Sequence, residues 1–293
     1  MQNTQNNISN NEQRPKLLIP KIDVVFHSLF RTHKEKLTSN FVSSLLQDKI
    51  KIIDMDKDRN LLKEYTDEKL GILDLRTELE GGTLCNVEIQ LADKGNIIDR
   101  ILYYWSRIFN QQLKTGAQYQ ELHKTIAILI IDFEIQELRG IDELGLKWKI
   151  MLDYHEKRLL TDKLEIVIIE IPKAKRILKN NQNNEIAQWM MFLDNPNSME
   201  VSNIMEENDK IKEAMEELEK ISQDESLRRI AELKEKYILD ESSARRYYKE
   251  QGLAEGRAEL KNVITNMLKN GLNKEQISSM TGMSIEKIEE LSK

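Results

Sequence analysis

The spacing of apolar and polar positions divides the first two thirds of the chain into short helices and strands. Apolar residues recur at intervals of three and four over residues 22–30, 37–46 and 97–113, which predicts three helices. Runs typical of strands occupy residues 50–53, 71–79, 83–91, 125–133 and 164–171. Strands flanked by helices in this order predict an α/β fold, a mixed β-sheet with helices on its faces.

The same patterns suggest three parts to the chain. Residues 1–15 are polar and rich in Asn and Gln, which predicts a disordered tail, whereas residues 16–195 hold all the predicted strands and form one domain. Residues 196–293 have no strand-like run and predict a helical extension that ends in a helix-turn-helix-like segment, with its turn at Thr281-Gly282. A long amphipathic helix, a helical hairpin and a coiled-coil dimer all fit the extension, so its helices are a candidate surface for homo-oligomers.

Composition excludes several classes of protein. The 293 residues carry a net charge of −6, so the chain does not coat nucleic acid through bulk positive charge, and any contact needs a local patch. The single cysteine, Cys85, excludes an internal disulfide and a multi-cysteine zinc site. Apolar runs too short for a membrane span and a start without a signal pattern predict a cytoplasmic protein with no membrane partner. No Walker A or GxGxxG motif indicates a nucleotide cofactor.

The segment from Gly71 to Leu91 predicts a β-hairpin whose register decides its chemistry. Glu80-Gly81-Gly82 is a turn signal between two alternating runs. A three-residue loop places Asp74 opposite Glu88 on one face, with Cβ atoms about 4.5–5.5 Å apart. A two-residue loop would place these carboxylates on opposite faces.

Two opposed carboxylates repel each other unless something compensates their charge. They suit a hard divalent cation such as Mg²⁺, which could polarise a phosphodiester and activate a water molecule. The spacing alone also fits an edge hairpin whose polar face meets water, with Arg76 screening the acids.

Asp74, a glycine-containing turn and then Glu88-Ile89-Gln90 in NVEIQ resemble the D…(E)xK/Q core of the PD-(D/E)XK nuclease superfamily. The chain is most similar to the recombination-promoting nuclease (Rpn) group, the PD-(D/E)XK nuclease family transposases. Further stretches of similarity, in family order, are KIDVVFHSLF, DRILYYWSRIFNQQLKTGAQY, LEIVIIEIPK and MLKNGLNKEQISSMTGMSIEKIEEL.

This resemblance implies a restriction-endonuclease-like core and an endonuclease that hydrolyses DNA with Mg²⁺, or with Mn²⁺ in its place, in recombination or mobile-element activity. Asp74 and Glu88 would hold the cation, with the backbone carbonyl of Ile89 as a third ligand. Gln90 stands where most of the superfamily has Lys, and it can orient by hydrogen bonding but brings no charge. Asp23 would approach the metal or, alternatively, cap the first helix. The alternative function is a weak or inactive nuclease-fold protein that acts in DNA binding, assembly or regulation.

A polar stripe on the helix after the hairpin is the candidate DNA contact. Its members recur every three or four positions, and they are Arg100, Tyr104, Arg107, Gln111 and Lys114. Basic side chains can bind phosphates and aromatic rings can stack on bases, although a simply solvated helix face has the same pattern. In the final helix, Glu286, Glu289 and Glu290 favour packing or protein contact over reading of a DNA groove.

Overall fold

The computed structural model describes residues 16–30, 35–55, 75–93, 95–151 and 158–292. Asp74 lies outside the described residues. In chain order, the helices and strands are α1 (Asp23–Phe30), α2 (Glu35–Leu46), β1 (Ile52–Met55), β2 (Leu75–Leu79), β3 (Leu84–Gln90), α4 (Ile97–Asn110), η1 (Tyr119–Glu121), β4 (Thr125–Ile131), η2 (Gln136–Leu138), β5 (Gly145–Met151), β6 (Leu159–Glu170), η3 (Ile171–Lys173), α5 (Ala174–Asn180), α6 (Glu185–Asp194), α7 (Met199–Glu207), α8 (Asp209–Ile221), α9 (Glu225–Lys269), α10 (Lys274–Thr281) and α11 (Ile285–Ser292).

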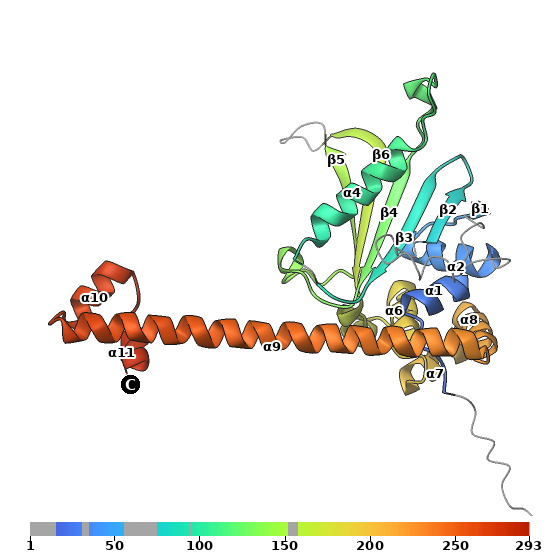
Figure 1. Cartoon of the computed structure of the whole chain (residues 1–293). Coiled ribbons are helices and arrows are strands. Elements are labelled where there is room, and N and C mark those ends of the chain that lie inside the picture. The colour runs from blue at the N-terminus through green and yellow to red at the C-terminus, as the bar shows by residue number, and fades with distance from the viewer. Residues whose placement is uncertain (1–15, 31–34, 56–74, 94, 152–157, 293) are drawn as a thin grey trace, which may run out of the picture. The chain divides into compact units, whose positions relative to one another are not determined.

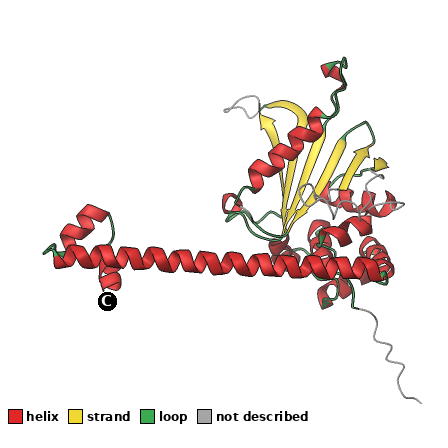
Figure 2. Cartoon of the chain, in the orientation of Figure 1, coloured by secondary structure: helices red, strands yellow, loops and turns green. Residues whose placement is uncertain are grey.

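Six strands form one mixed sheet in the order β1-β2-β3-β4-β6-β5 (Figures 1 and 2). Strands β3, β4 and β6 are parallel, and the remaining neighbours are antiparallel. Helix α4 connects β3 to β4 as a crossover on one face, which a parallel pair requires. The predicted α/β fold with a mixed sheet and flanking helices is confirmed.

Successive side chains of β3 point to opposite faces of the sheet, and each face has its own apolar core. On one face, Cys85 and Val87 join the larger core with residues of α1, α2, α6 and α8. On the other face, Ile97 and Ile101 of α4 pack against Leu129 and other aliphatic residues of β4 and β6. Figure 1 shows α4 crossing this second face, which is called the α4 face below.

The larger core extends past the domain boundary predicted at residue 195. Val201 of α7 and Ile211 and Leu218 of α8 are fully buried in it. The compact unit accordingly runs to Glu235, within α9, because these amphipathic helices bury their apolar sides in the core of the sheet domain.

Residues Lys236–Lys293 form a second compact unit. Its small core joins Ile264 of α9 to Ile277 of α10 and to Ile288 and Leu291 of α11. The side chain of Asn273 caps α10 by accepting a hydrogen bond from the backbone of Gln276 at 2.8 Å.

Among the described residues, no helix is both long enough and apolar enough to span a membrane.

Candidate functional site

The turn between β2 and β3 fixes the register of the hairpin. The backbone N–H of Leu79 donates to the carbonyl of Thr83 at 2.8 Å, which leaves a loop of Glu80, Gly81 and Gly82. Gly82 has a φ of +80°, and a Cβ there would approach the Nδ1 atom of His123 to 2.6 Å. A side chain at this position would therefore strain the backbone and collide with the imidazole.

The described pairs of the hairpin, among them Leu75 with Val87 and Thr77 with Cys85, have the register predicted for a three-residue loop. The prediction that Asp74 faces Glu88 depends on this register. Asp74 is outside the described residues, so its pairing stays a prediction.

Glu88 is buried in the α4 face, and its carboxylate meets α4. The side chain is 6% exposed, and its Oε1 atom accepts a hydrogen bond from the Nη2 atom of Arg100 at 2.7 Å. Burial raises the pKa of the Glu88 carboxyl, and the Arg100 charge and hydrogen bond oppose that rise. Folding thus places a carboxylate where its ionised form is disfavoured and compensates it with one cation.

Arg100 is held by a second contact as well. Its Cζ atom lies 5.4 Å from the ring centroid of Tyr104, one turn further along α4, within the range of a cation–π interaction. Within the described part of the chain, the Nε atom of Arg100 is buried without a hydrogen-bond partner. The guanidinium therefore keeps donor capacity beyond its bond to Glu88.

The other members of the predicted DNA-contact stripe differ in how exposed they are. Tyr104 is half-buried, whereas Arg107 and Gln111 are exposed at the end of α4. Lys114 is exposed and lies beyond Asn110, where the helix ends. The stripe thus runs from a partly buried ion pair at Arg100 to exposed side chains at its far end.

Gln90 and Asp23 make contacts of their own. The Nε2 atom of Gln90 donates to the carbonyl of Ala92 at 3.0 Å. Asp23 begins α1, whose apolar residues belong to the core on the opposite face from Glu88. Its two carboxylate oxygens accept hydrogen bonds from the backbone of Val24 at 2.8 Å and from Lys234 at 3.1 Å. A metal-binding role for Asp23 stays a prediction.

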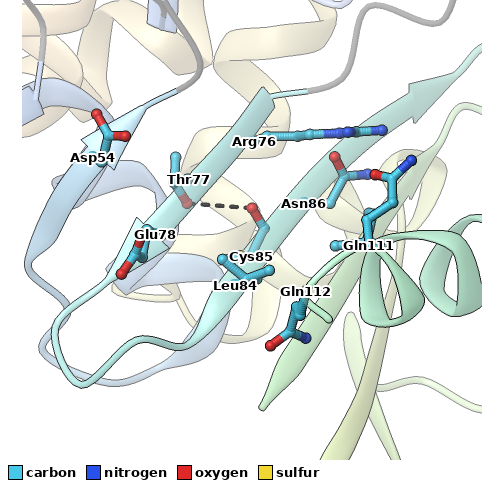
Figure 3. Close-up of a pocket in the computed structure, with 10 residues that line it drawn as sticks. Asp54, Arg76, Thr77, Glu78, Leu84, Cys85, Asn86, Gln111 and Gln112 are labelled. Carbon is cyan, nitrogen blue, oxygen red and sulfur yellow. Dashed lines mark hydrogen bonds between the residues drawn. The ribbon is translucent and has the colours of Figure 1, made fainter. Parts of the chain in front are cut away.

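A pocket of about 290 Å³ lies beside this site, between the β2–β3 hairpin and the end of α4 (Figure 3). Arg76, Asn86 and Gln111 line it, together with Leu84 and Ile108. Asn86 lies two positions before Glu88 on β3 and shares the α4 face with it. The sequence shows Asn86 on the polar side of the strand, but polarity alone does not reveal that the residue is buried.

A charged cluster that the sequence did not reveal lies at the carboxyl ends of β3 and β4. Lys21 bridges Asp132 at 2.7 Å and Asp194 at 2.6 Å. The backbone N–H of Asp132 donates to the carbonyl of Gln90, which ties the cluster to the end of β3. Lys21 comes before α1, so its contact with Asp132, the residue after β4, follows only from the three-dimensional fold.

Residues 20–248 match the family model described as PD-(D/E)XK nuclease family transposase. The chain belongs to this family. A search of curated proteins found no match, and neither did a search of solved structures. The match to the PD-(D/E)XK nuclease family transposases includes the hairpin and α4, and it supports a nuclease-type function that acts on DNA. Nucleases of the PD-(D/E)XK type generally use divalent metal ions.

Proposed function

We propose that the protein is a metal-dependent DNA endonuclease, linked to recombination or mobile-element activity, in which Glu88 binds the cation. The observation that carries the proposal is the Glu88 carboxylate, buried on β3 and hydrogen-bonded, among the described residues, to Arg100 alone. A buried carboxylate with so little compensation opposes folding, and such groups cluster at functional sites.

The donor set suits a hard divalent cation. The described residues include no cluster of three or more His, Cys, Asp or Glu side chains that could hold a metal. Mg²⁺ commonly binds through only one or two carboxylates and fills its other positions with water and substrate phosphate oxygens. Glu88 supplies one such carboxylate, and we assign Asp74 as the second and the carbonyl of Ile89 as a further ligand. A cation bound there would polarise the phosphodiester and lower the pKa of a bound water.

Arg100 has two roles in this proposal. Without a cation its guanidinium compensates the Glu88 charge. With a cation beside Glu88, the guanidinium would be free to bind a phosphate oxygen of the DNA, a task that its planar donor set performs well. Arg107 and Lys114, both exposed, would bind neighbouring phosphates. Gln90 would orient the attacking water by hydrogen bonding, and Arg100 supplies the charge that Gln90 lacks.

Conversion of supercoiled plasmid by purified protein, with Mg²⁺, Mn²⁺ or EDTA, tests the proposal. We expect cleavage with either metal and none with EDTA, and we expect Glu88→Gln to lower the rate by roughly 100-fold or more, since even partners of metal ligands are worth 10- to 100-fold. Glu165→Gln is the matched control. Glu165 is just as buried but lies on the opposite face, paired with Lys124 at 2.7 Å, and its variant should cleave normally.

Equal cleavage by wild type and Glu88→Gln would overturn the assignment of Glu88. A folded wild-type protein that binds DNA but cleaves with neither metal would favour the alternative, a nuclease-fold protein that acts through DNA binding, assembly or regulation.

A further inference from the structure

The side chains that line the pocket beside Glu88 suit a flat, polar ring. Leu84 and Ile108 supply apolar surface, while Asn86 and Gln111 bring amide groups from the strand and from the end of α4. Figure 3 shows the side chains of Asn86, Gln111 and Arg76 converging above β3. Apolar walls with a few convergent polar groups are typical of small-molecule sites.

The Oδ1 atom of Asn86 is a hydrogen-bond acceptor that a ligand could satisfy. The residue is 3% exposed, and within the described part of the chain its Oδ1 atom is buried without a hydrogen-bond partner. A buried acceptor left unsatisfied loses the hydrogen bond that it makes to water in the unfolded chain, so native structures rarely keep one without a reason. The natural complement of Oδ1 is an N–H donor carried by a ligand in the pocket.

We propose that this pocket receives one nucleobase of an unpaired DNA strand, whose exocyclic amino group donates to Asn86. The inference rests on the proposed nuclease function. Residues two apart on a strand lie about 6.6 Å from each other, so a base beside Asn86 belongs to a nucleotide next to the phosphate at Glu88. The base is unpaired because a base inside a duplex is stacked between its neighbours and must leave the stack to enter a pocket.

A base fits this pocket better than a phosphate does. Two carboxylates, Asp54 and Glu78, line the pocket against the single guanidinium of Arg76, so the charge of the lining disfavours an anion. Amide side chains, in contrast, match the donor and acceptor edges of bases, as Asn and Gln do when they read adenine. Adenine, cytosine and guanine offer an exocyclic amino group to Oδ1, whereas the N3–H donor of thymine lies between two carbonyl oxygens that Oδ1 would repel.

Fluorescence anisotropy of the full-length protein with labelled twelve-nucleotide oligomers of dC or of dT tests the proposal. EDTA is present throughout, so binding is measured without cleavage. One hydrogen bond to a buried acceptor predicts that the dC oligomer binds roughly three- to tenfold more tightly than the dT oligomer. A duplex of the same length should place no base in the pocket. Its affinity should therefore be the same for wild type and for the pocket variants below.

Asn86→Leu removes the acceptor and keeps the side-chain size, so the preference for dC should fall below about twofold while the affinity for dT is unchanged. Gln111→Ala is a second variant at an exposed position, where folding is not at risk, and it should weaken the preference in the same direction. The matched control is Asn110→Ala, an exposed amide on the same helix that does not line the pocket, and it should keep the wild-type preference.

Equal binding of dC and dT by the wild type would overturn the proposal, and so would a preference that survives in Asn86→Leu. Free dCMP separates a strand from a mononucleotide. If dCMP binds in an Asn86-dependent way and the dC oligomer does not, the pocket serves a free nucleotide and the DNA assignment is wrong. The cleavage assay reports on Glu88 with metal, and the binding assay reports on Asn86 without metal, so each proposal can fail alone.

Discussion

Two buried carboxylates lie on the α4 face of the sheet, Glu88 on β3 and Glu170 on β6, and their surroundings differ. Glu170 pairs with Lys173, and both side chains are 2% exposed. Glu170 also accepts a hydrogen bond from the backbone of Ile135 at 2.9 Å, and Lys173 donates to the carbonyls of Leu138 and Ile141. This pair ties the segment after β4 to the end of β6.

The Glu88–Arg100 pair has fewer hydrogen bonds than the Glu170–Lys173 pair. One hydrogen bond joins the two side chains, and Arg100 is 24% exposed with its Nε atom unsatisfied. An ion pair that serves the fold must saturate its partners to offset desolvation, as the Glu170 pair does. The unsaturated pair leaves a carboxylate and a guanidinium that ligands can engage, and the proposed function assigns them to a cation and to DNA.

The largest expected effect is on the structural pair. Lys173→Met leaves Glu170 buried without its cation, so we expect the free energy of unfolding to fall by about 3–5 kcal/mol. Urea denaturation followed by circular dichroism measures it. Lys175→Met is the matched control, because Lys175 pairs with Glu200 at the surface and its loss should leave the free energy of unfolding nearly unchanged. Equal losses in both variants would remove the distinction between the two kinds of pair.

The opposite behaviour is expected at the second pair. Arg100→Met removes the cation that competes for Glu88, and a charge-assisted hydrogen bond of about 1.5–3 kcal/mol no longer has to be broken. Mn²⁺ should therefore bind the DNA-free variant about 10- to 100-fold more tightly, as calorimetry can measure. DNA binding should weaken, and the slope of log affinity against log salt should fall by about 0.9. Weaker Mn²⁺ binding would show that Arg100 supports the metal site rather than competing with it.

Local patterns predicted the hairpin well because the turn signal and the two-residue period are properties of neighbouring residues. The alternation of Leu146, Trp148 and their lysine neighbours is the same signal, and it belongs to β5, which is not among the five strands predicted from the sequence. The contact between Glu88 and Arg100 depends on the direction of the α4 crossover, and spacing along the chain does not give that direction. The burial of Asn86 likewise follows only once α4 covers β3.

A smaller effect is expected in the pH dependence of stability. The folded protein raises the pKa of Glu88, so between the usual Glu range and the raised value the folded state holds a proton that the unfolded chain releases. Wild type should therefore lose stability relative to Glu88→Gln as the pH rises through that interval. Urea titrations of both proteins in EDTA at several pH values measure the difference.

Glu185 should affect the pH dependence of stability in the opposite direction. Its burial alone would raise the pKa, but hydrogen bonds from Ser44 and Lys210 outweigh burial and lower it. Glu185 thus contributes stability above the usual Glu range that is lost as the pH falls through the lowered value. Relative to its Glu185→Gln variant, wild type should gain stability as the pH rises. The same sign at both sites would contradict the assignment of Glu88 as an under-compensated carboxylate.

The last prediction is that the reactivity of Cys85 does not change in Glu88→Gln, and it tests whether that variant keeps the structure of β3. Cys85 is three residues before Glu88 on β3 but faces the opposite core, and burial raises the pKa of its thiol to about 12. At pH 8 the folded protein should react slowly with iodoacetamide and the urea-unfolded chain quickly, because the thiolate is the reactive form. Intact-mass spectrometry should give equal labelling rates for folded wild type and folded Glu88→Gln. Faster labelling of the variant would mean that the substitution disturbs β3, and its loss of cleavage would then reflect the strand rather than the carboxylate.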